Sequence, residues 1–197
     1  ASTMAREFAV YAAKKAKRPV WLVDLDLFGA GQHKALAADT ARFGILGKPS
    51  QASPDGSTFI DVQPPARTPQ GAVRSSARYV AAHSAMRGRL WVTRFRKEAM
   101  QPGQAVSLTG SSAYWNALAA HAEYVIIDTP AADRSSAAVI LANQVDATVL
   151  VVAAEAADGR GPAALKAALQ ERGGRIAGLV FNRSRLRPPP FLEKLLS

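Results

Sequence analysis

The sequence predicts an α/β protein: a doubly wound, mostly parallel sheet flanked by helices. Two short apolar runs carry this prediction, because each continues without a polar break until it meets an acid: VWLVDLD at residues 20–26 and YVIIDTP at residues 124–130. Such runs are typical of strands buried on both faces of a parallel sheet. They alternate with helical patterns along the chain, which indicates right-handed crossovers between parallel strands.

The chain has 197 residues, a hydrophobic fraction of 48% and no cysteine. This length suits one domain, so residues 1–197 are expected to form a single α/β unit. No apolar run approaches the roughly 20 residues that span a bilayer, and no secretory signal stands at the start. These features, with a cysteine content that suits a reducing compartment, predict a cytoplasmic protein without a transmembrane segment.

The formal charge of +10 is concentrated in two stretches. Residues 63–97 contain eight basic side chains and no acid, and residues 172–187 contain five arginines. Nucleic acid, an anionic membrane surface, nucleotide phosphates or an acidic protein would each suit such a surface. The alternative is a solvated basic face without a partner. The basic residues of the first stretch are Arg67, Arg74, Arg78, Arg87, Arg89, Arg94, Arg96 and Lys97.

The N-terminal part is expected to begin with a helix that Ser2 or Thr3 caps and that runs to about Lys17. A buried strand follows from Pro19 and ends in acids and glycines. The region between about residues 40 and 110 has the least regular pattern and is interpreted as an elaboration on the sheet. The further elements expected here are a helix at 33–42, a strand at 57–62, a helix at 72–86 and a strand at 89–95.

The C-terminal part has a more regular pattern. Ser111 or Ser112 can cap a helix through about residue 122, and the strand YVIID follows it. Pro162 suits the first turn of a later helix, which Gly173 and its neighbouring glycine end. The other elements expected here are a helix at 134–143 and buried strands at 147–154 and 175–182.

Asp24, Asp26 and Asp128 are the candidate catalytic residues. Ligands of open parallel sheets bind beyond the carboxyl ends of the strands, so an acid at that end of a strand points to the site. If the two strands are neighbours, their acids meet and could hold Mg²⁺ and orient a nucleophile. The alternatives are that Asp128 only opens a turn before Pro130, and that the other two acids only solvate a strand end.

The order of these landmarks resembles the deviant-Walker P-loop ATPases, the group of the ParA and MinD proteins and of the bacterial tyrosine kinases of polysaccharide export. The matching segments are Ser2-Thr3, VWLVDLD, YVIIDTP and, at residues 178–183, GLVFNR. They correspond to the start of the first helix after the phosphate loop, an Asp-x-Asp strand, a Walker B strand and a late Asn-Arg strand. The resemblance covers most of the chain except about residues 40–110.

The resemblance implies a role for each matching residue. Ser2 would ligate Mg²⁺, Thr3 would contact the α-phosphate, and Asp128 would hold a metal-bound water. The two acids of the Asp-x-Asp motif would position the metal or the attacking water. Asn182 and Arg183 would border the adenine base. The alternatives are a simple helix cap for Ser2 and the start of a loop for the Asn-Arg pair.

The sequence also departs from the family pattern. Ala1 stands where the family has its phosphate-binding lysine, and the sequence contains neither the glycine-rich loop nor the first strand expected upstream of residue 1. Phe28 stands where the kinases carry an arginine, Ala131 stands where they carry a second proline, and no tyrosine follows Tyr124. The lysine is a point charge on the β- and γ-phosphates, so these departures predict weak or absent binding of ATP and Mg²⁺ and negligible catalysis.

The resemblance and its departures together predict a degenerate P-loop ATPase or pseudokinase. We expect it to regulate bacterial exopolysaccharide biosynthesis or export through a membrane-bound partner, which would recruit it to the inner membrane. The resemblance also implies a homo-oligomer. The alternative is a ParA/MinD-like positioning protein that binds DNA or a membrane surface non-specifically, which the basic stretch favours.

Overall fold

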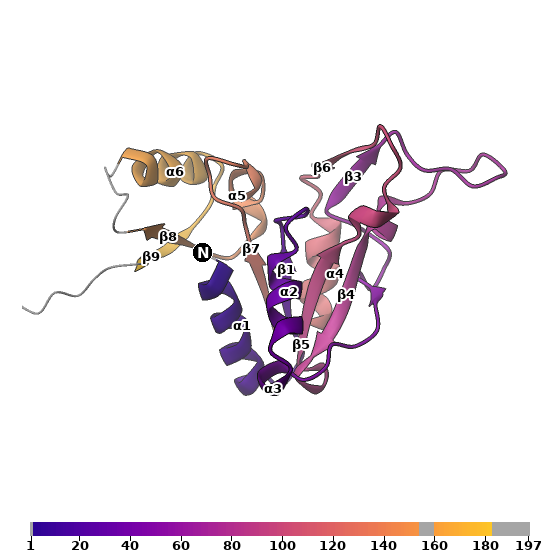
Figure 1. The fold of residues 1–197 in the computed structure, drawn as a ribbon. Helices are drawn as coiled ribbons and strands as arrows, with labels where there is room; N and C mark the ends of the chain where they lie inside the picture. Colours follow the sequence, from indigo (N-terminus) through magenta and orange to yellow (C-terminus); the bar gives the residue numbers. More distant parts are fainter. Residues whose placement is uncertain (1, 154–159, 183–197) are drawn as a thin grey trace, which may run out of the picture.

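The computed structural model describes residues 2–153 and 160–182 (Figure 1). Its largest sheet has five strands in the order β2-β4-β5-β1-β7. These strands are β1 (Val20–Asp24), β2 (Ser50–Gln51), β4 (Val80–Ala85), β5 (Leu90–Phe95) and β7 (Tyr124–Asp128). All five residues of β1 are buried, because both faces of this strand are covered by other elements.

The α/β class is confirmed, but the pairings differ from those expected. β1 pairs in parallel with β5 and with β7, whereas β4 pairs antiparallel with both β5 and β2. The sheet is therefore mixed, and a doubly wound, mostly parallel sheet is not confirmed in the described residues. Antiparallel neighbours need only a tight connection. That connection is the short 3₁₀ turn η2 (Met86–Gly88) between β4 and β5.

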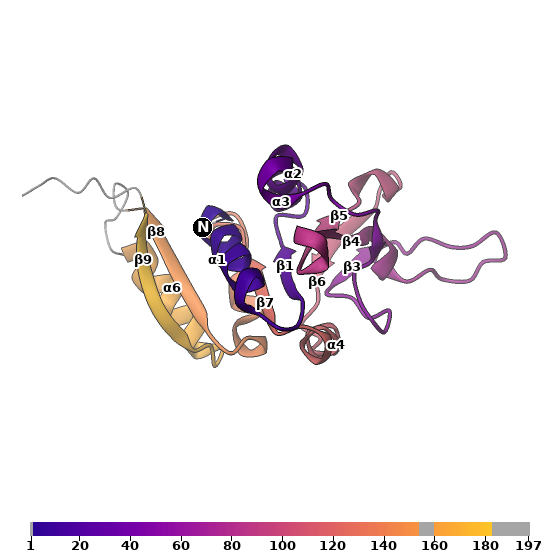
Figure 2. The same cartoon turned by 90° about the horizontal axis from the view of Figure 1, so that it is seen from below.

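One face of the sheet packs against α1 (Ser2–Lys15), α2 (Gly31–Ala38) and α3 (Thr40–Phe43). Every second residue of β1 points to this face, so Val20 and Leu22 are buried against Val10 of α1 and Leu36 of α2. Figure 2 shows α1 and α2 on the same side of β1. The expected first helix is thus confirmed, and it ends two residues before Lys17.

The opposite face packs against α4 (Ala113–His121) and a two-stranded antiparallel sheet of β3 (Ile60–Gln63) and β6 (Ala105–Leu108). Trp21 and Val23 of β1 point into this core. Trp21 stacks on Trp91 with ring centroids 5.6 Å apart, and Phe59 packs on Tyr114. Helices therefore cover both faces of the five-stranded sheet.

The expected helix at residues 72–86 is wrong. This segment forms the 3₁₀ turn η1 (Ser76–Tyr79) and then strand β4. Alanine favours helices in isolation, but its side chain is small enough to be buried between two packed layers, and tertiary pairing overrides a weak propensity. Ala82 and Ala85 are buried in this strand. The region of residues 40–110 therefore supplies three strands of the five-stranded sheet and is more than an elaboration on it.

β7 was expected to be buried on both faces, and this expectation is also wrong. It lies at the edge of the sheet, and Tyr124 at its start is 48% exposed. Only Asp128, its last residue, is buried. An edge strand has one side without a pairing partner, which accounts for the exposure.

β8 (Thr148–Ala153) and β9 (Ile176–Asn182) form a parallel pair outside the five-stranded sheet, and α6 (Arg160–Glu171) connects them. Both were expected to be buried strands, but Leu150 is the only residue of either that is buried. Leu150 packs with Leu169 of α6 and Ala142. Gly173 follows α6 with φ of +78°, a conformation that favours glycine and ends a helix, as predicted.

The remaining elements are short. The helix expected at 134–143 is reduced to α5 (Ala137–Ile140) and the 3₁₀ turn η4 (Ala142–Gln144). A further 3₁₀ turn, η3 (Lys97–Ala99), follows β5. In the part of the chain that the structure describes, no helix combines the length and apolar character needed to cross a bilayer.

Candidate functional site

Asp24 and Asp128 are neighbours at the carboxyl ends of β1 and β7. The parallel register of these strands pairs the two aspartates directly, and both side chains are buried, with 3% and 4% of their surface exposed. The backbone N–H of Leu25 donates to the carbonyl of Asp128 over 2.9 Å, which extends the pairing past the last residue of β1. The structure thus brings two of the three predicted acids together where the sequence placed them.

Gln32 is the residue that connects this pair to the helices above it. Its side chain is completely buried. The amide nitrogen Nε2 donates to Oδ2 of Asp128 over 2.7 Å and to the backbone carbonyl of Ser2 over 2.8 Å. Its backbone N–H donates to Oδ2 of Asp24 over 2.9 Å. One residue of α2 therefore binds both carboxylates and the start of α1.

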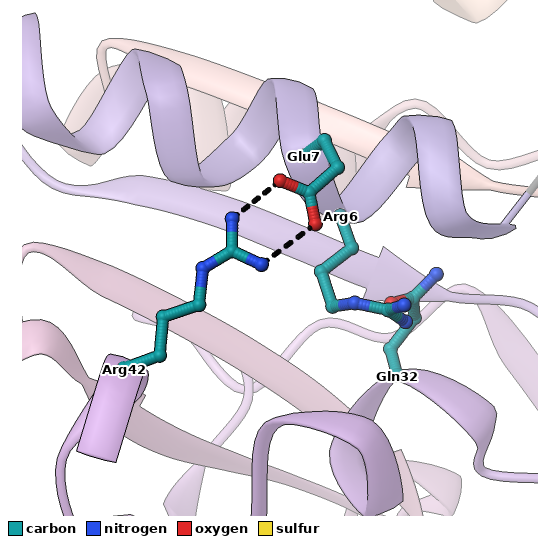
Figure 3. A network of polar contacts seen from close by, with 4 residues as sticks. All are labelled: Arg6, Glu7, Gln32 and Arg42. Atoms are coloured by element: carbon teal, nitrogen blue, oxygen red, sulfur yellow. Dashed lines mark hydrogen bonds and ion pairs between the residues drawn. The ribbon is translucent and has the colours of Figure 1, made fainter. Parts of the chain in front are cut away.

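Arg6 of α1 completes the contacts of Gln32. Its guanidinium donates to Oε1 of Gln32 over 3.3 Å, and Figure 3 shows the two side chains meeting between α1 and α2. The same view shows Glu7 accepting two hydrogen bonds from Arg42 at the surface. Every polar atom of the Gln32 amide group thus has a partner, which orients its nitrogen toward Asp128.

Both oxygens of Asp24 already accept hydrogen bonds from the backbone. Oδ1 accepts from the N–H of Asp26 over 2.9 Å, and Oδ2 accepts from the N–H of Gln32. The N–H of Asp24 itself donates to Oγ1 of buried Thr93 over 3.0 Å. Burial raises the pKa of Asp24 to about 6, and the nearby negative charges of Asp128 and Asp26 act in the same direction against the two backbone hydrogen bonds. Asp24 is therefore a buried, fully hydrogen-bonded group.

Asp26 does not join the pair. It is half-buried, its carbonyl accepts the N–H of Ala30 over 3.0 Å, and its Oδ1 accepts the N–H of Gly29 over 3.3 Å. A Cβ at Gly29 would lie 2.4 Å from Oδ2 of Asp26. The loop between β1 and α2 thus curls around this carboxylate, which makes Asp26 a loop-forming residue here.

The other predicted site residues contribute little to this cluster. Ser2 takes part through its backbone carbonyl only, and its side chain and that of Thr3 are exposed at the start of α1. Asn182 ends β9, which belongs to the separate strand pair. Ala1 and Arg183 lie outside the described residues.

A histidine pair lies on the same face of the sheet. The rings of His33 and His83 meet edge to face at 4.5 Å. Nδ1 of His83 lies 2.9 Å from the carbonyl of Gly47, so it is the donor, and buried Nε2 has no hydrogen-bond partner. Burial lowers the pKa of His33, and His83 and Arg94 add to that effect.

The residues at this site do not suit Mg²⁺ as they are arranged. A magnesium ion needs several oxygen ligands, and it would compete here with N–H donors that already bind both oxygens of Asp24 and one oxygen of Asp128. Within residues 2–153 and 160–182, no group of three or more His, Cys, Asp or Glu side chains could hold a metal ion. The geometry describes a closed polar cluster.

Sequence reasoning missed Gln32, Arg6 and Thr93. Gln32 is an uncharged residue two positions after the unusual Ala30, whose φ is +47°, and nothing in the one-dimensional pattern distinguishes it from a surface glutamine. The available signal was its place in the first turn of the helix that follows an acid-ended strand, where side chains face the carboxyl edge of the sheet.

Comparisons with known proteins give little further guidance. No protein-family model matches the chain, and no curated protein matches it. Among solved structures, the kinase domain of VpsO is similar over 93% of this chain and 95% of its own, with 17% sequence identity and a TM-score of 0.46. A likeness of this level supports no assignment of function.

Proposed function

We propose that this domain is a catalytically silent member of the deviant-Walker type that regulates bacterial exopolysaccharide biosynthesis or export through a membrane-bound partner. The observation that supports its silence is the Gln32 amide, which donates to Asp128 and to the carbonyl of Ser2. The link to polysaccharide rests on the order of the sequence motifs. The absence of catalysis and the role in polysaccharide biosynthesis or export are tested by separate experiments.

Gln32 supports the inactive assignment for a physical reason. The resemblance places Mg²⁺ beside Ser2 and Asp128. The amide nitrogen of Gln32 donates to the backbone carbonyl of Ser2 at 2.8 Å and to Oδ2 of Asp128 at 2.7 Å, so a buried side chain already bridges these two residues. An N–H donor and a metal ion compete for the same lone pair of a carboxylate. A metal ion at Oδ2 of Asp128 would compete with the N–H of Gln32, and losing that hydrogen bond in a buried position would cost about 1–3 kcal/mol.

Calorimetry with ATP, in the presence and absence of Mg²⁺, tests the inactive assignment. We expect binding of ATP at the site of Asp128 to be weak or absent, with no gain in affinity on adding Mg²⁺ and negligible hydrolysis. Turnover of ATP or autophosphorylation on tyrosine by the purified protein would contradict it. Lys34 and Lys48, both exposed, would then be the lysines to replace in search of the one that reaches the phosphates.

Deletion of the gene tests the biological part. We expect changed amounts of capsule or adhesive polysaccharide and co-purification of the domain with a membrane protein of that system. Unchanged polysaccharide would refute this role even if the protein proved inactive toward ATP, so the two parts fail separately.

The second candidate function is non-specific binding of DNA by a positioning protein. It is favoured by the exposed basic side chains of residues 67–97, since neutralising phosphates gives an affinity that falls steeply with salt. A gel shift at low and moderate salt decides between the two functions. Absence of a shift, or a shift insensitive to salt, would remove this candidate.

A further inference from the structure

A cavity of about 580 Å³ lies on the side of the sheet away from Asp24 and Asp128, next to edge strand β2. Its walls come from the loop after β2, the turn η1 and the residue that follows β5. The charged residues that line it are three arginines, Arg74, Arg78 and Arg96, and no acid lines it. From these observations we propose that this cavity binds a small organic phosphate, a phosphate or diphosphate ester whose charge the three arginines neutralise.

The three arginines reach the cavity from backbone positions that are fixed by hydrogen bonds. The N–H of Arg74 donates to the carbonyl of Ala66 over 2.8 Å, at the base of the loop that projects after β3 (Figure 1). The N–H of Arg96 donates to the carbonyl of Tyr79 over 2.7 Å. Arg78 lies in η1, and its guanidinium packs over the ring of Tyr79 at 5.4 Å. The fold thus fixes the backbone positions from which the three arginines line the cavity.

The three arginines make no ion pair within the described part of the chain, although Arg96 is near enough to Glu98 to help lower the pKa of that acid. The ion pairs found in the described part of the chain are Glu7 with Arg42 and Glu98 with Arg94, and neither involves an arginine of the cavity. Three guanidinium groups around one hollow repel one another, so a bound anion relieves that repulsion. Arginine also presents paired N–H donors that match the oxygens of a phosphate, which favours a phosphate over a simple counter-ion.

Asp55 is the acid closest to the cavity in sequence, and its carboxylate is bound within its own loop. Its carboxylate accepts from the hydroxyls of Ser53 and Ser57 and from the N–H of Ser57. These hydrogen bonds, with the side-chain bond from Ser57 the largest, lower the pKa of Asp55 to about 2. Asp55 therefore shapes the loop that walls the cavity, although it does not line the cavity.

The rest of the lining indicates an organic ester and not a bare anion. Ala52 and Val80 supply apolar lining, and buried Tyr114 fixes Ala52 by donating its hydroxyl to the carbonyl of Ala52 over 3.1 Å. Ser75 also lines the cavity, and because its Oγ accepts from the N–H of Ala77, its hydroxyl hydrogen is available for an anion. The volume lies within the range of about 300–1,000 Å³ that is usual for small-molecule sites.

Calorimetric titrations with inorganic pyrophosphate, a nucleoside diphosphate and a sugar phosphate test the proposal. The variant Arg74→Gln/Arg78→Gln/Arg96→Gln removes the charges of the cavity. Its control, Arg87→Gln/Arg89→Gln/Arg172→Gln, removes the same charge from exposed positions that do not line the cavity. Circular dichroism and thermal unfolding establish that both variants are folded.

We expect at least one organic phosphate to bind more tightly than pyrophosphate, about tenfold or more weaker binding in the cavity variant, and a change of no more than about twofold in the control. An equal loss in both variants would show that only the general basic field attracts anions and would overturn the proposal. If pyrophosphate binds as tightly as every organic ester, the claim that the cavity recognises the organic group of its ligand is overturned. Binding of DNA that depends on the cavity arginines, with no binding of small phosphates, would assign the surface to nucleic acid instead.

A second substitution tests the cavity without changing charge. Ala77→Phe would place a large apolar ring at a partly exposed position of the cavity wall, so we expect it to weaken binding of the organic phosphate and to leave pyrophosphate binding within about threefold. If Ala77→Phe does not fold, Val80→Ala removes an apolar contact of the cavity and should weaken ester binding in the same way. Retention of full ester affinity in the folded variant would contradict the site.

Discussion

Replacing Gln32 with methionine should destabilise the protein more than any other change on α2. Methionine has nearly the same length but no hydrogen-bonding amide, so the carboxylate of Asp128 and the carbonyl of Ser2 would each lose a donor in the buried interior. A hydrogen bond to a charged group contributes about 1.5–3 kcal/mol and a neutral one about 1 kcal/mol. We therefore expect the free energy of unfolding to fall by about 3 kcal/mol.

Urea unfolding followed by circular dichroism measures this change. Lys34→Met is the matched control, because Lys34 is exposed on the same helix, and surface substitutions usually change stability by less than about 0.5 kcal/mol. A loss of less than about 1 kcal/mol in Gln32→Met would refute the reasoning. Such a result would mean that water replaces the amide and that the cluster is open to solvent.

Three further predictions concern single side-chain contacts in the N-terminal part of the chain. Between pH 3.8 and about 6, the folded state holds the proton of Asp24 more tightly than the unfolded chain does. The contribution of this group to the free energy of unfolding therefore falls by at most about 3 kcal/mol as pH rises through that window. Asp24→Asn should not show this pH-dependent fall, and urea unfolding with the same pH dependence in the variant and the natural protein would contradict the prediction. Gly29→Ala should lower the free energy of unfolding by about 1 kcal/mol, because its Cβ would meet the carboxylate of Asp26. Gly31→Ala, whose Cβ would meet no atom within 4 Å, should leave stability unchanged or raise it. A larger loss of stability in Gly31→Ala than in Gly29→Ala would show that the loop around Asp26 rearranges at little cost. Glu7→Gln breaks the exposed ion pair with Arg42 of α3. It should lower the free energy of unfolding by less than about 1 kcal/mol, and by less still at high salt. A larger loss, or one that does not depend on salt in thermal unfolding, would show that the pair behaves as a buried ion pair.

The sequence by itself determined the elements that depend on local pattern. Strand β1 and the strand that ends in Asp128 were predicted because an unbroken apolar run followed by an acid is a strong one-dimensional signal. The end of α6 at Gly173 was predicted because a positive φ favours glycine. The meeting of Asp24 with Asp128 was predicted only on the condition that the two acid-ended strands are neighbours, and the pairing of β1 with β7 in the structure meets that condition.

Tertiary structure decided everything that depends on which strand lies beside which. The segment containing β4 has helical composition, and only its pairing with β2 and β5 makes it a strand. The exposure of Tyr124 follows from the edge position of β7, which composition does not encode. The role of Gln32 arose only when α1 and α2 met above two strands, because a buried amide is defined by partners 30 and 96 residues away. The same reason applies to the three arginines of the cavity, whose shared location is set by the turns and strands that carry them.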